Sequence, residues 1–378
     1  MEKKGRRGDA ALSRDLRETR RNAPPRAVQD RAAPELDELD RSIVHALQIH
    51  PRAPWTLVGE VLGVDPVTAA RRWQRLADAG LAWVTAHPRL ANSRVVATGV
   101  IEVDTEPGAA VNVASALAAD HAMVNVKLTS GGRDVIAEVQ VRDFDELLGL
   151  TTRLFQGMPG VRATRAHIST GMPTEGSQWR LRSLDGDQCA RLDTAALPPP
   201  ARPESDAEAG WDALDARLLE LLGADGRMPM RRLAATTEVG LTTVRRRLQA
   251  LLPSRVSLRC DLARTPFGWP LSAVYFASVP AQHLAETSRV LSGFREVRAC
   301  AIMAGPHNLV IDVWLRALSD VHAFEAHLAR RLPRLTIDDR SLVLRTVKHM
   351  GRLLDGDGRS VGIVPLPCGV PPAVGALP

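Results

Sequence analysis

The feature that most constrains the fold of this chain is an internal duplication. The run from Val64 to Leu76, Val-Asp-Pro-Val-Thr-Ala-Ala-Arg-Arg-Trp-Gln-Arg-Leu, has a counterpart 175 residues later, from Val239 to Leu251. Arg52-Ala-Pro54 and Arg227-Met-Pro229 keep the same spacing, and Met158 and Leu332 begin matching segments 174 residues apart. Solenoid repeats have periods of roughly 20–50 residues, so this much longer period indicates that a complete module occurs twice.

Each copy of the repeated run predicts a helix with a buried and an exposed side. Asp65 suits the capping position before the first helix, and Pro66 suits its first turn. An apolar stripe at helical spacing follows in both copies, at Ala69, Trp73 and Leu76 and at Val244, Leu248 and Leu251. Trp73 belongs to this stripe, so we expect it in the core rather than in a stacking site.

The opposite sides of the two helices carry the candidate DNA contacts. An arginine cluster is commonly just the solvated side of a helix, but in a duplicated helix-turn-helix, phosphate or base contact is the stronger interpretation. The candidates are Arg52, Val67, Thr68, Arg71, Arg72 and Arg75, together with Thr242, Thr243, Arg245, Arg246 and Arg247. Because the outward residues of the two copies differ, we expect a pseudo-palindromic operator with unlike half-sites.

The periodicity predicts an α+β fold class in each copy. Three helices, at about 36–50, 54–62 and 65–79, with a short turn before the third, are typical of a helix-turn-helix domain of the winged type. A strand over 81–87 follows, and then a ferredoxin-like βαββαβ order from 95 to 169. A sheet with helices on only one face needs cover on the other, so the two sheets are expected to pair.

The same patterns divide the chain into seven segments. We expect a disordered basic tail (1–34) and a disordered C-terminal tail (355–378), with an aperiodic, proline-rich linker at 176–210. The basic tail is either an unused extension or a source of non-specific DNA affinity. The helix-turn-helix domains are placed at 35–90 and 211–264, and the βαββαβ domains at 91–175 and 265–354.

Composition excludes some classes of function. The chain has 49 Lys and Arg residues against 43 Asp and Glu, a net charge of +6, which is compatible with a polyanionic partner. Only four of the basic residues are Lys, which reflects either codon usage or the suitability of Arg for phosphate and guanine contacts. The four scattered Cys residues predict neither a metal site nor disulfides, and no apolar run is long enough to span a membrane. We therefore expect a cytoplasmic protein without a membrane partner.

Four stretches of the first copy resemble the leucine- and asparagine-responsive (Lrp/AsnC, feast/famine) regulators. They are Leu36-Asp-Glu-Leu-Asp40, Leu47-Gln48 with Arg52, Leu62-Gly-Val-Asp-Pro66 and Arg75-Leu-Ala-Asp-Ala-Gly-Leu81. The βαββαβ domains resemble the ligand-sensing RAM domain of that family. The resemblance implies a transcription factor that binds double-stranded DNA and associates through its RAM sheets, here in cis or in trans. It implies neither a cofactor nor enzymatic activity.

The resemblance also implies an amino-acid-like effector held at the RAM interface. The family's loop there usually reads Gly-x-Tyr-Asp, and both copies depart from it because the aromatic residue is absent. The candidate ligand residues are Gly132, Arg133 and Asp134 in the first copy and Gly305, His307 and Asn308 in the second. The departure weakens the case for amino-acid binding, since an α-amino group needs a carboxylate or carbonyl groups nearby.

Two alternatives stay open. Siroheme decarboxylases resemble the same two-part fold and hold a tetrapyrrole with His and Arg around the RAM-like sheet, where this chain has His307 and Arg133. A coloured protein or a failure to retard DNA would favour that alternative. A partner that forms mixed oligomers without reading DNA would suit the weaker second helix-turn-helix.

Overall fold

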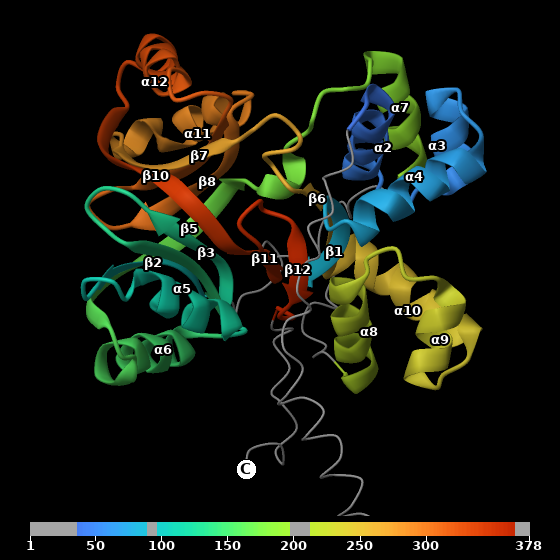
Figure 1. Cartoon of the computed structure of the whole chain (residues 1–378), viewed down its shortest axis with the longest axis horizontal. Helices are drawn as coiled ribbons and strands as arrows, with labels where there is room; N and C mark the ends of the chain where they lie inside the picture. The colour runs from blue at the N-terminus through green and yellow to red at the C-terminus, as the bar shows by residue number, and fades with distance from the viewer. Residues whose placement is uncertain (1–35, 89–96, 197–211, 367–378) are drawn as a thin grey trace, which may run out of the picture. The chain divides into compact units, whose positions relative to one another are not determined.

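The computed structural model describes residues 36–88, 97–196 and 212–366, so the basic tail and the end of the C-terminal tail lie outside the described residues (Figure 1). Each copy begins with three helices and a strand. In the first copy these are α2 (Glu38–Ile49), α3 (Trp55–Leu62), α4 (Pro66–Asp78) and β1 (Ala82–Pro88). In the second they are α8 (Ala213–Ala224), α9 (Met230–Thr237), α10 (Leu241–Ser254) and β6 (Val256–Leu262). Both helix-turn-helix domains are thus present.

Local signals set the turns of the first helix-turn-helix. Asp37 and Asp40 form a capping box at the start of α2, which satisfies backbone N–H groups that a helix end leaves free. Gly63 ends α3 in the left-handed region at φ 66°, which a glycine adopts without a steric penalty. The side chain of Asp65 then accepts hydrogen bonds from the N–H groups of Val67 and Thr68 to begin α4.

The two helix-turn-helix domains meet across an approximate two-fold axis. Strands β1 and β6 pair antiparallel from Ala82 with Leu262 to Pro88 with Val256. Nearby, Arg52 donates to the carbonyl oxygens of Gly226 (2.6 Å) and Met228 (3.0 Å). Its counterpart Arg227 donates in return to the carbonyls of Pro51 and Ala53. One chain therefore makes within itself the kind of self-complementary contact that a symmetric dimer makes between subunits.

The remaining elements of both copies build one closed sheet. The first copy contributes β2 (Ala97–Thr105), β3 (Met123–Thr129), β4 (Val135–Val141) and β5 (Val161–Thr174), with α5 (Ala110–Ala119) and α6 (Phe144–Gly157). The second contributes β7 (Leu271–Ser278), β8 (Val297–Ala304), β9 (Leu309–Leu315) and β10 (Thr336–His349), with α11 (Leu284–Ser292) and α12 (Asp320–Arg331). Eight strands follow each other as β10-β3-β4-β2-β5-β8-β9-β7, and β7 returns to β10.

This barrel refines the expected pair of ferredoxin-like sheets. The strand and helix order of each copy is as expected, but the sheets join edge to edge instead of remaining two separate layers. The cause is the length of β5 and β10, 14 residues each. Their far ends leave their own copy and pair, through bulges, with β8 and β3 of the other copy. RAM pairing therefore occurs in cis.

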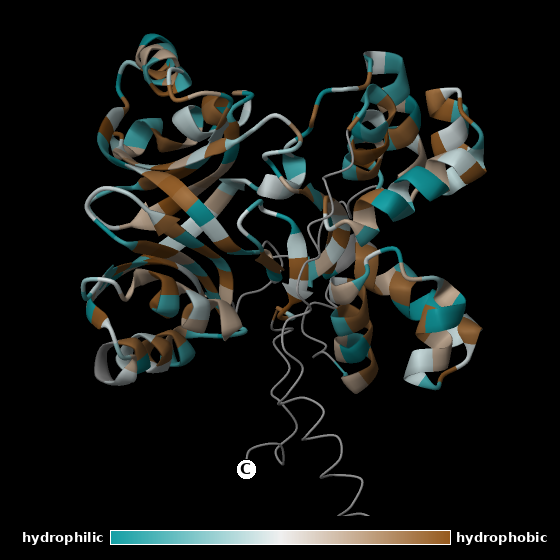
Figure 2. Ribbon diagram, in the orientation of Figure 1, coloured by the Kyte–Doolittle hydropathy of each residue, from teal (hydrophilic) through white to brown (hydrophobic). Residues whose placement is uncertain are grey.

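Apolar side chains fill three regions of the barrel domain. The helices of the first copy cover a core between α5, α6 and the outer face of β2, β3 and β4, and those of the second cover the equivalent core beside β7, β8 and β9. A third, smaller cluster lies inside the barrel and includes Val100, Val274 and Phe276. Figure 2 shows the apolar residues concentrated along the strands. Among the described residues, no helix is both long and apolar enough to cross a membrane.

Two segments expected to lack structure are ordered. Within the presumed linker, α7 (Gly186–Ala195) begins at a capping box of Asp185 and Gln188, and Leu192 enters the core of the first helix-turn-helix. Beyond residue 354, β12 (Ser360–Ile363) pairs with β11 (Arg352–Leu354). The C-terminal hairpin contacts both helix-turn-helix domains, because the N–H of Ser360 donates to Gly80 and the side chain of Arg352 donates to the carbonyl of Ala224.

The link to α7 makes the stability of the chain pH-dependent. His45 Nδ1 accepts hydrogen bonds at 3.0 Å from the N–H groups of Ser183 and Leu184, which requires a neutral ring. Burial, and then the charges of Arg180 and Arg182, lower the pKa of His45 from 6.5 to about 4. The unfolded state therefore takes up a proton first as the pH falls.

We predict that this contribution to stability is complete above pH 6.5 and is lost as the pH falls towards 4. Denaturant titrations of wild type and His45→Gln at intervals across that window measure it, because the glutamine oxygen keeps an acceptor that does not titrate. The variant should show a shallower dependence of unfolding free energy on pH. Parallel dependences would assign the pH effect to other groups.

Candidate nucleic-acid interface and barrel interior

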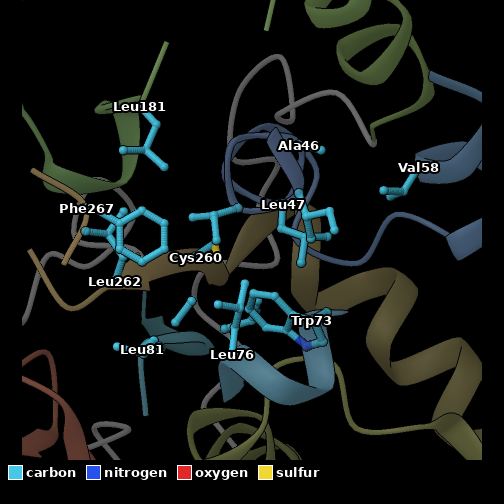
Figure 3. Close-up of a cluster of buried hydrophobic side chains, with 14 of the residues drawn as sticks. Ala46, Leu47, Val58, Trp73, Leu76, Leu81, Leu181, Cys260, Leu262 and Phe267 are labelled. Carbon is cyan, nitrogen blue, oxygen red and sulfur yellow. The ribbon is translucent and has the colours of Figure 1, made fainter. Parts of the chain in front are cut away.

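The recognition helix α4 is anchored by its apolar side. Ala69, Trp73 and Leu76 are buried against α2 and α3, and Figure 3 shows Trp73 and Leu76 beside Leu47. Trp73 is only 6% exposed, so it is a core residue and is unavailable for stacking. The equivalent stripe of α10, Val244, Leu248 and Leu251, is buried in the same way.

The outward residues of α4 fall into two groups. Val67 is 73% exposed, Arg71 is exposed and Thr68 is half-buried. Arg72 instead pairs with Asp37 and Asp40, and Arg75 Nη2 lies 2.5 Å from Asp40 Oδ2. The carboxylate of Asp40 is fully buried, so these two arginines neutralise a charge that would otherwise destabilise the fold. The sequence placed Arg72 and Arg75 with the DNA contacts; their ion pairs give them a positioning role.

The second recognition helix repeats this division. Thr242, Arg245 and Arg246 are exposed and Thr243 is half-buried. Arg247 corresponds to Arg72 and lies 2.7 Å from Asp212 and 3.4 Å from Asp215. Arg52, another candidate DNA contact, holds the two helix-turn-helix domains together through the carbonyl contacts described above.

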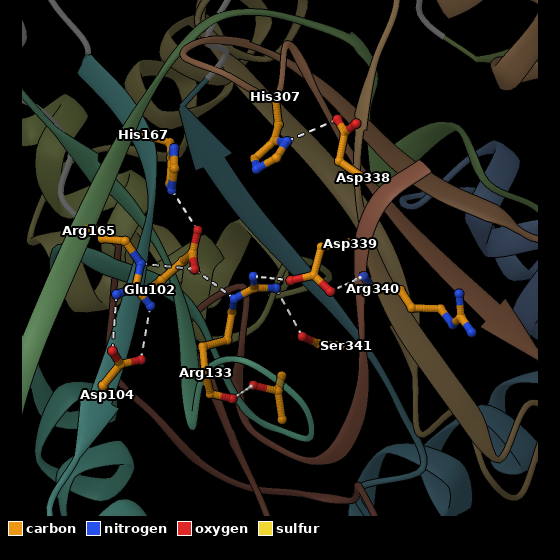
Figure 4. Close-up of polar contacts among 11 residues, drawn as sticks. Glu102, Asp104, Arg133, Arg165, His167, His307, Asp338, Asp339, Arg340 and Ser341 are labelled. Atoms are coloured by element: carbon orange, nitrogen blue, oxygen red, sulfur yellow. Dashed lines mark hydrogen bonds and ion pairs between the residues drawn. The ribbon is translucent and has the colours of Figure 1, made fainter. Parts of the chain in front are cut away.

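The structure places the six candidate ligand residues at one end of the barrel (Figure 4). Asp134 accepts hydrogen bonds from the N–H and hydroxyl of Thr105, and Asn308 exchanges two hydrogen bonds with the backbone of Val279. Both therefore fix their loops. A Cβ atom at Gly132 or Gly305 would lie 3.6–3.8 Å from Asp339 or His167, so these glycines border the same cluster.

Arg133 and His307 approach Phe276 from the two copies. The guanidinium of Arg133 lies 4.3 Å from the centre of the Phe276 ring and contacts Glu102 (2.6 Å), Asp339 (2.5 Å) and Ser341 (3.0 Å). The ring of His307 lies 5.8 Å from that of Phe276, and its Nδ1 is 2.9 Å from Asp338. These two candidates meet in space although 174 residues separate them.

Glu102 is the electrostatic centre of this end of the barrel. Its carboxylate contacts Arg133, Arg165 and, at 2.6 Å, His167 Nε2. Burial alone would raise the pKa of Glu102, but the hydrogen bond with His167 and the charges of Arg133 and Arg165 lower it to about 2. Glu102 is consequently an anion at neutral pH that holds its basic neighbours in place, and it is unsuited to proton transfer there.

Two buried ionic groups inside the barrel were missed by sequence reasoning. Lys127 Nζ lies 2.8 Å from Glu138 and 2.7 Å from Asp312 of the other copy. At the end nearest β6, Asp261 pairs with Arg259 and Arg298. The available signal was a charged residue at an inward position of an otherwise apolar strand, as in Met-Val-Asn-Val-Lys-Leu from Met123 and Val-Ile-Ala-Glu-Val from Val135. Alternation alone does not say which face of a strand lines an interior.

Comparison with known proteins identifies the domains. The model of the AsnC-type helix-turn-helix domain matches residues 36–77 and 212–252, and that of the Lrp/AsnC ligand binding domain matches residues 98–179. An uncharacterized HTH-type transcriptional regulator of Pyrococcus horikoshii is 28% identical over 141 residues, 36% of this chain and 88% of the relative. HTH-type transcriptional regulator FL11 of Pyrococcus abyssi is 26% identical over 144 residues, 38% of this chain and 95% of the relative.

A solved structure corrects one expectation. Siroheme decarboxylase NirDL matches 83% of this chain and 93% of its own, with a TM-score of 0.55 and 11% identity. This likeness concerns the fold alone, but it extends through both copies, so the same architecture carries an enzyme. The expectation that the chain lacks enzymatic activity, which rested on the regulator resemblance, is therefore withdrawn. By its matched domains the chain belongs to the Lrp/AsnC family of transcriptional regulators, and it carries the AsnC-type helix-turn-helix twice.

Proposed function

We propose that the protein is a sequence-specific DNA-binding regulator in which one chain presents both reading heads. The observation that carries this proposal is the shared build of α4 and α10. Each is anchored by a buried apolar stripe and leaves its opposite side, with Arg71 or with Arg245 and Arg246, in solvent. A helix held in this way can enter the major groove without unfolding its own domain.

The proposed DNA contacts are fewer than the sequence suggested. Val67, Thr68 and Arg71 on α4, and Thr242, Thr243, Arg245 and Arg246 on α10, are proposed to touch DNA, because none of their side chains is engaged in an ion pair that supports the fold. Arg52, Arg72, Arg75 and Arg247 are proposed to position the heads. Ala70 in the first head corresponds to Arg245 in the second, and Arg suits guanine and phosphate, so the two half-sites should differ.

Selection of bound fragments from random duplex DNA tests this proposal. The full chain should enrich a site with two half-sites of different sequence, one of them richer in guanine contacts. Enrichment of a perfect palindrome, or of no sequence at all, would contradict it. Repeating the selection with a chain whose α10 outward residues are replaced by those of α4 (Thr242→Val, Arg245→Ala and Arg246→Arg retained) should shift the second half-site towards the first.

We also propose that a small molecule modulates binding at the contact between the RAM domains. Asp134 and Asn308 are occupied by their own loops, so an effector there would meet Arg133 and His307. These residues come from different copies and share Phe276. Occupancy would therefore act on the contact between the halves of the barrel.

A second candidate function is chemistry on a carboxylated tetrapyrrole. Two observations support it: the fold match with NirDL runs through both copies, and His167 and His307, each beside a carboxylate, flank Phe276. Titration of the full chain with siroheme, followed by visible absorbance, tests it. A saturable spectral change that His167→Ala and His307→Ala both weaken would support this function, whereas an unchanged spectrum would exclude it.

A further inference from the structure

The interior of the barrel encloses a cavity that neither proposed function uses. Its volume is about 110 Å³, and its middle section is lined by apolar residues, Val100, Ile136, Val274, Met303 and Val310. An engineered apolar cavity of about 150 Å³ accepts benzene, so this one suits a ligand of roughly five to eight heavy atoms, provided that any polar part of the ligand finds a partner. The lining predicts that most of the ligand is hydrocarbon.

One end of the cavity offers a buried donor. The side chain of Arg298 is 3% exposed; its Nη1 donates to the carbonyl of Gly176 at 2.6 Å and its Nη2 pairs with Asp261. Its Nε has no hydrogen-bond partner among the residues that the structure describes. A buried N–H without an acceptor is costly, so a ligand oxygen placed there would gain affinity. Glu175, which precedes Gly176, lines the same end and accepts a hydrogen bond from the hydroxyl of Ser177 at 3.2 Å.

The other charged groups of the wall are already neutralised. Lys127 contacts both Glu138 and Asp312, and Glu138 also accepts from Asn125. Arg259 pairs with Asp261 at 2.6 Å. His349 borders this end, and burial lowers its pKa, so its ring adds no fixed charge at neutral pH. Arg298 and Glu175 are therefore the charged groups that can still bind a ligand.

From this geometry we infer that the cavity binds a small aliphatic carboxylic acid. The carboxylate accepts from Arg298 Nε, and the hydrocarbon part lies among Val100, Val274 and Met303. Glu175 stands where an α-ammonium group would follow the carboxylate, so an α-amino acid binds more tightly than the same acid without its amino group. The inference concerns the barrel interior and does not depend on DNA binding.

Calorimetric titration of the full chain with valine and with 3-methylbutanoate tests the inference. Both should bind saturably, valine more tightly. Ala301 lines the cavity on β8, and Ala304 on the same strand is exposed and does not. Ala301→Leu should fill the space and weaken both ligands by at least about tenfold, whereas Ala304→Leu should bind as wild type. The absence of saturable binding up to about 10 mM, or unchanged affinity in Ala301→Leu, would overturn the inference.

A second variant keeps the test decisive if Ala301→Leu does not fold. Glu175 is half-buried, and its replacement by Gln removes a charge without changing the volume. In Glu175→Gln the affinity for valine should fall to that for 3-methylbutanoate, while the affinity for 3-methylbutanoate stays the same or rises. An equal loss for both compounds, or for neither, would contradict the placement of the ligand's head group.

Discussion

Replacement of Lys127 by Met should lower the free energy of unfolding by about 3–5 kcal/mol, because removing one partner of a buried ionic group leaves uncompensated charge. The side chain of Lys127 is 4% exposed and pairs with carboxylates of both copies, Glu138 and Asp312. The lost pairing therefore weakens each half of the barrel and the contact between them. Denaturant titration of the full chain at pH 7 measures the change.

The control for this prediction is the triple variant Lys127→Met, Glu138→Gln and Asp312→Asn. It removes the uncompensated carboxylates as well and should recover most of the loss, since neutral groups of similar volume carry no charge penalty. A triple variant as unstable as the single one would assign the loss to packing. Burial opposes both shifts, but the ion pairs raise the pKa of Lys127 and lower that of Glu138.

The pH dependence of the wild type and the variant should also differ in sign. In the wild type the contribution of Glu138 is present above its ordinary pKa of 4.5 and is lost as the pH falls below it. Without Lys127, burial raises the pKa of the carboxyl, so the folded state binds a proton more readily than the unfolded state. The deficit of Lys127→Met should therefore shrink between pH 7 and pH 5.

The double variant Arg71→Ala and Arg246→Ala should weaken binding to the selected operator by about 10²–10⁴-fold, since each arginine that contacts a base or phosphate contributes about 1–3 kcal/mol. Both residues are exposed and outward on their helices. The dependence of log affinity on log salt should flatten by up to about one unit for each phosphate contact removed. Fluorescence anisotropy at several salt concentrations measures both effects.

A variant with the same change of charge separates contact from general attraction. Arg330 and Arg331 are exposed on α12 in the barrel domain, so Arg330→Ala with Arg331→Ala also removes two positive charges. This control should retain operator affinity within about threefold, because charges that make no contact act only through a screened field. Equal losses in the two double variants would show that net charge, and not the recognition helices, governs binding.

The elements of this fold could be predicted because their signals are local. The period of 3.6 residues, the cap at Asp65 and the glycine at Gly63 set α3 and α4 within a few residues of their expected bounds. The duplication likewise predicted the second copy from the first. The capping box of Asp185 and Gln188 carried the same kind of signal for α7, but proline-rich neighbours obscured it.

Closure of the barrel and the roles of single arginines could not be predicted, because both depend on residues distant in the sequence. No local pattern shows that β5 pairs with β8, or that β10 returns to β3. Arg71 and Arg72 are neighbours of the same type, yet only Arg72 faces the carboxylates of Asp37 and Asp40. A helix turn of about 100° per residue decides between the two, and its effect depends on the position of α2.

The central claim is that a single chain carries out, with two unlike heads, what a symmetric dimer does with two identical ones. Native mass spectrometry of the full chain with its selected two-half-site duplex tests this claim most directly. The structure predicts one chain for each duplex, because β1 and β6 and the reciprocal contacts of Arg52 and Arg227 pair the heads within the chain. Two chains for each duplex, with one head of each on DNA, would contradict it.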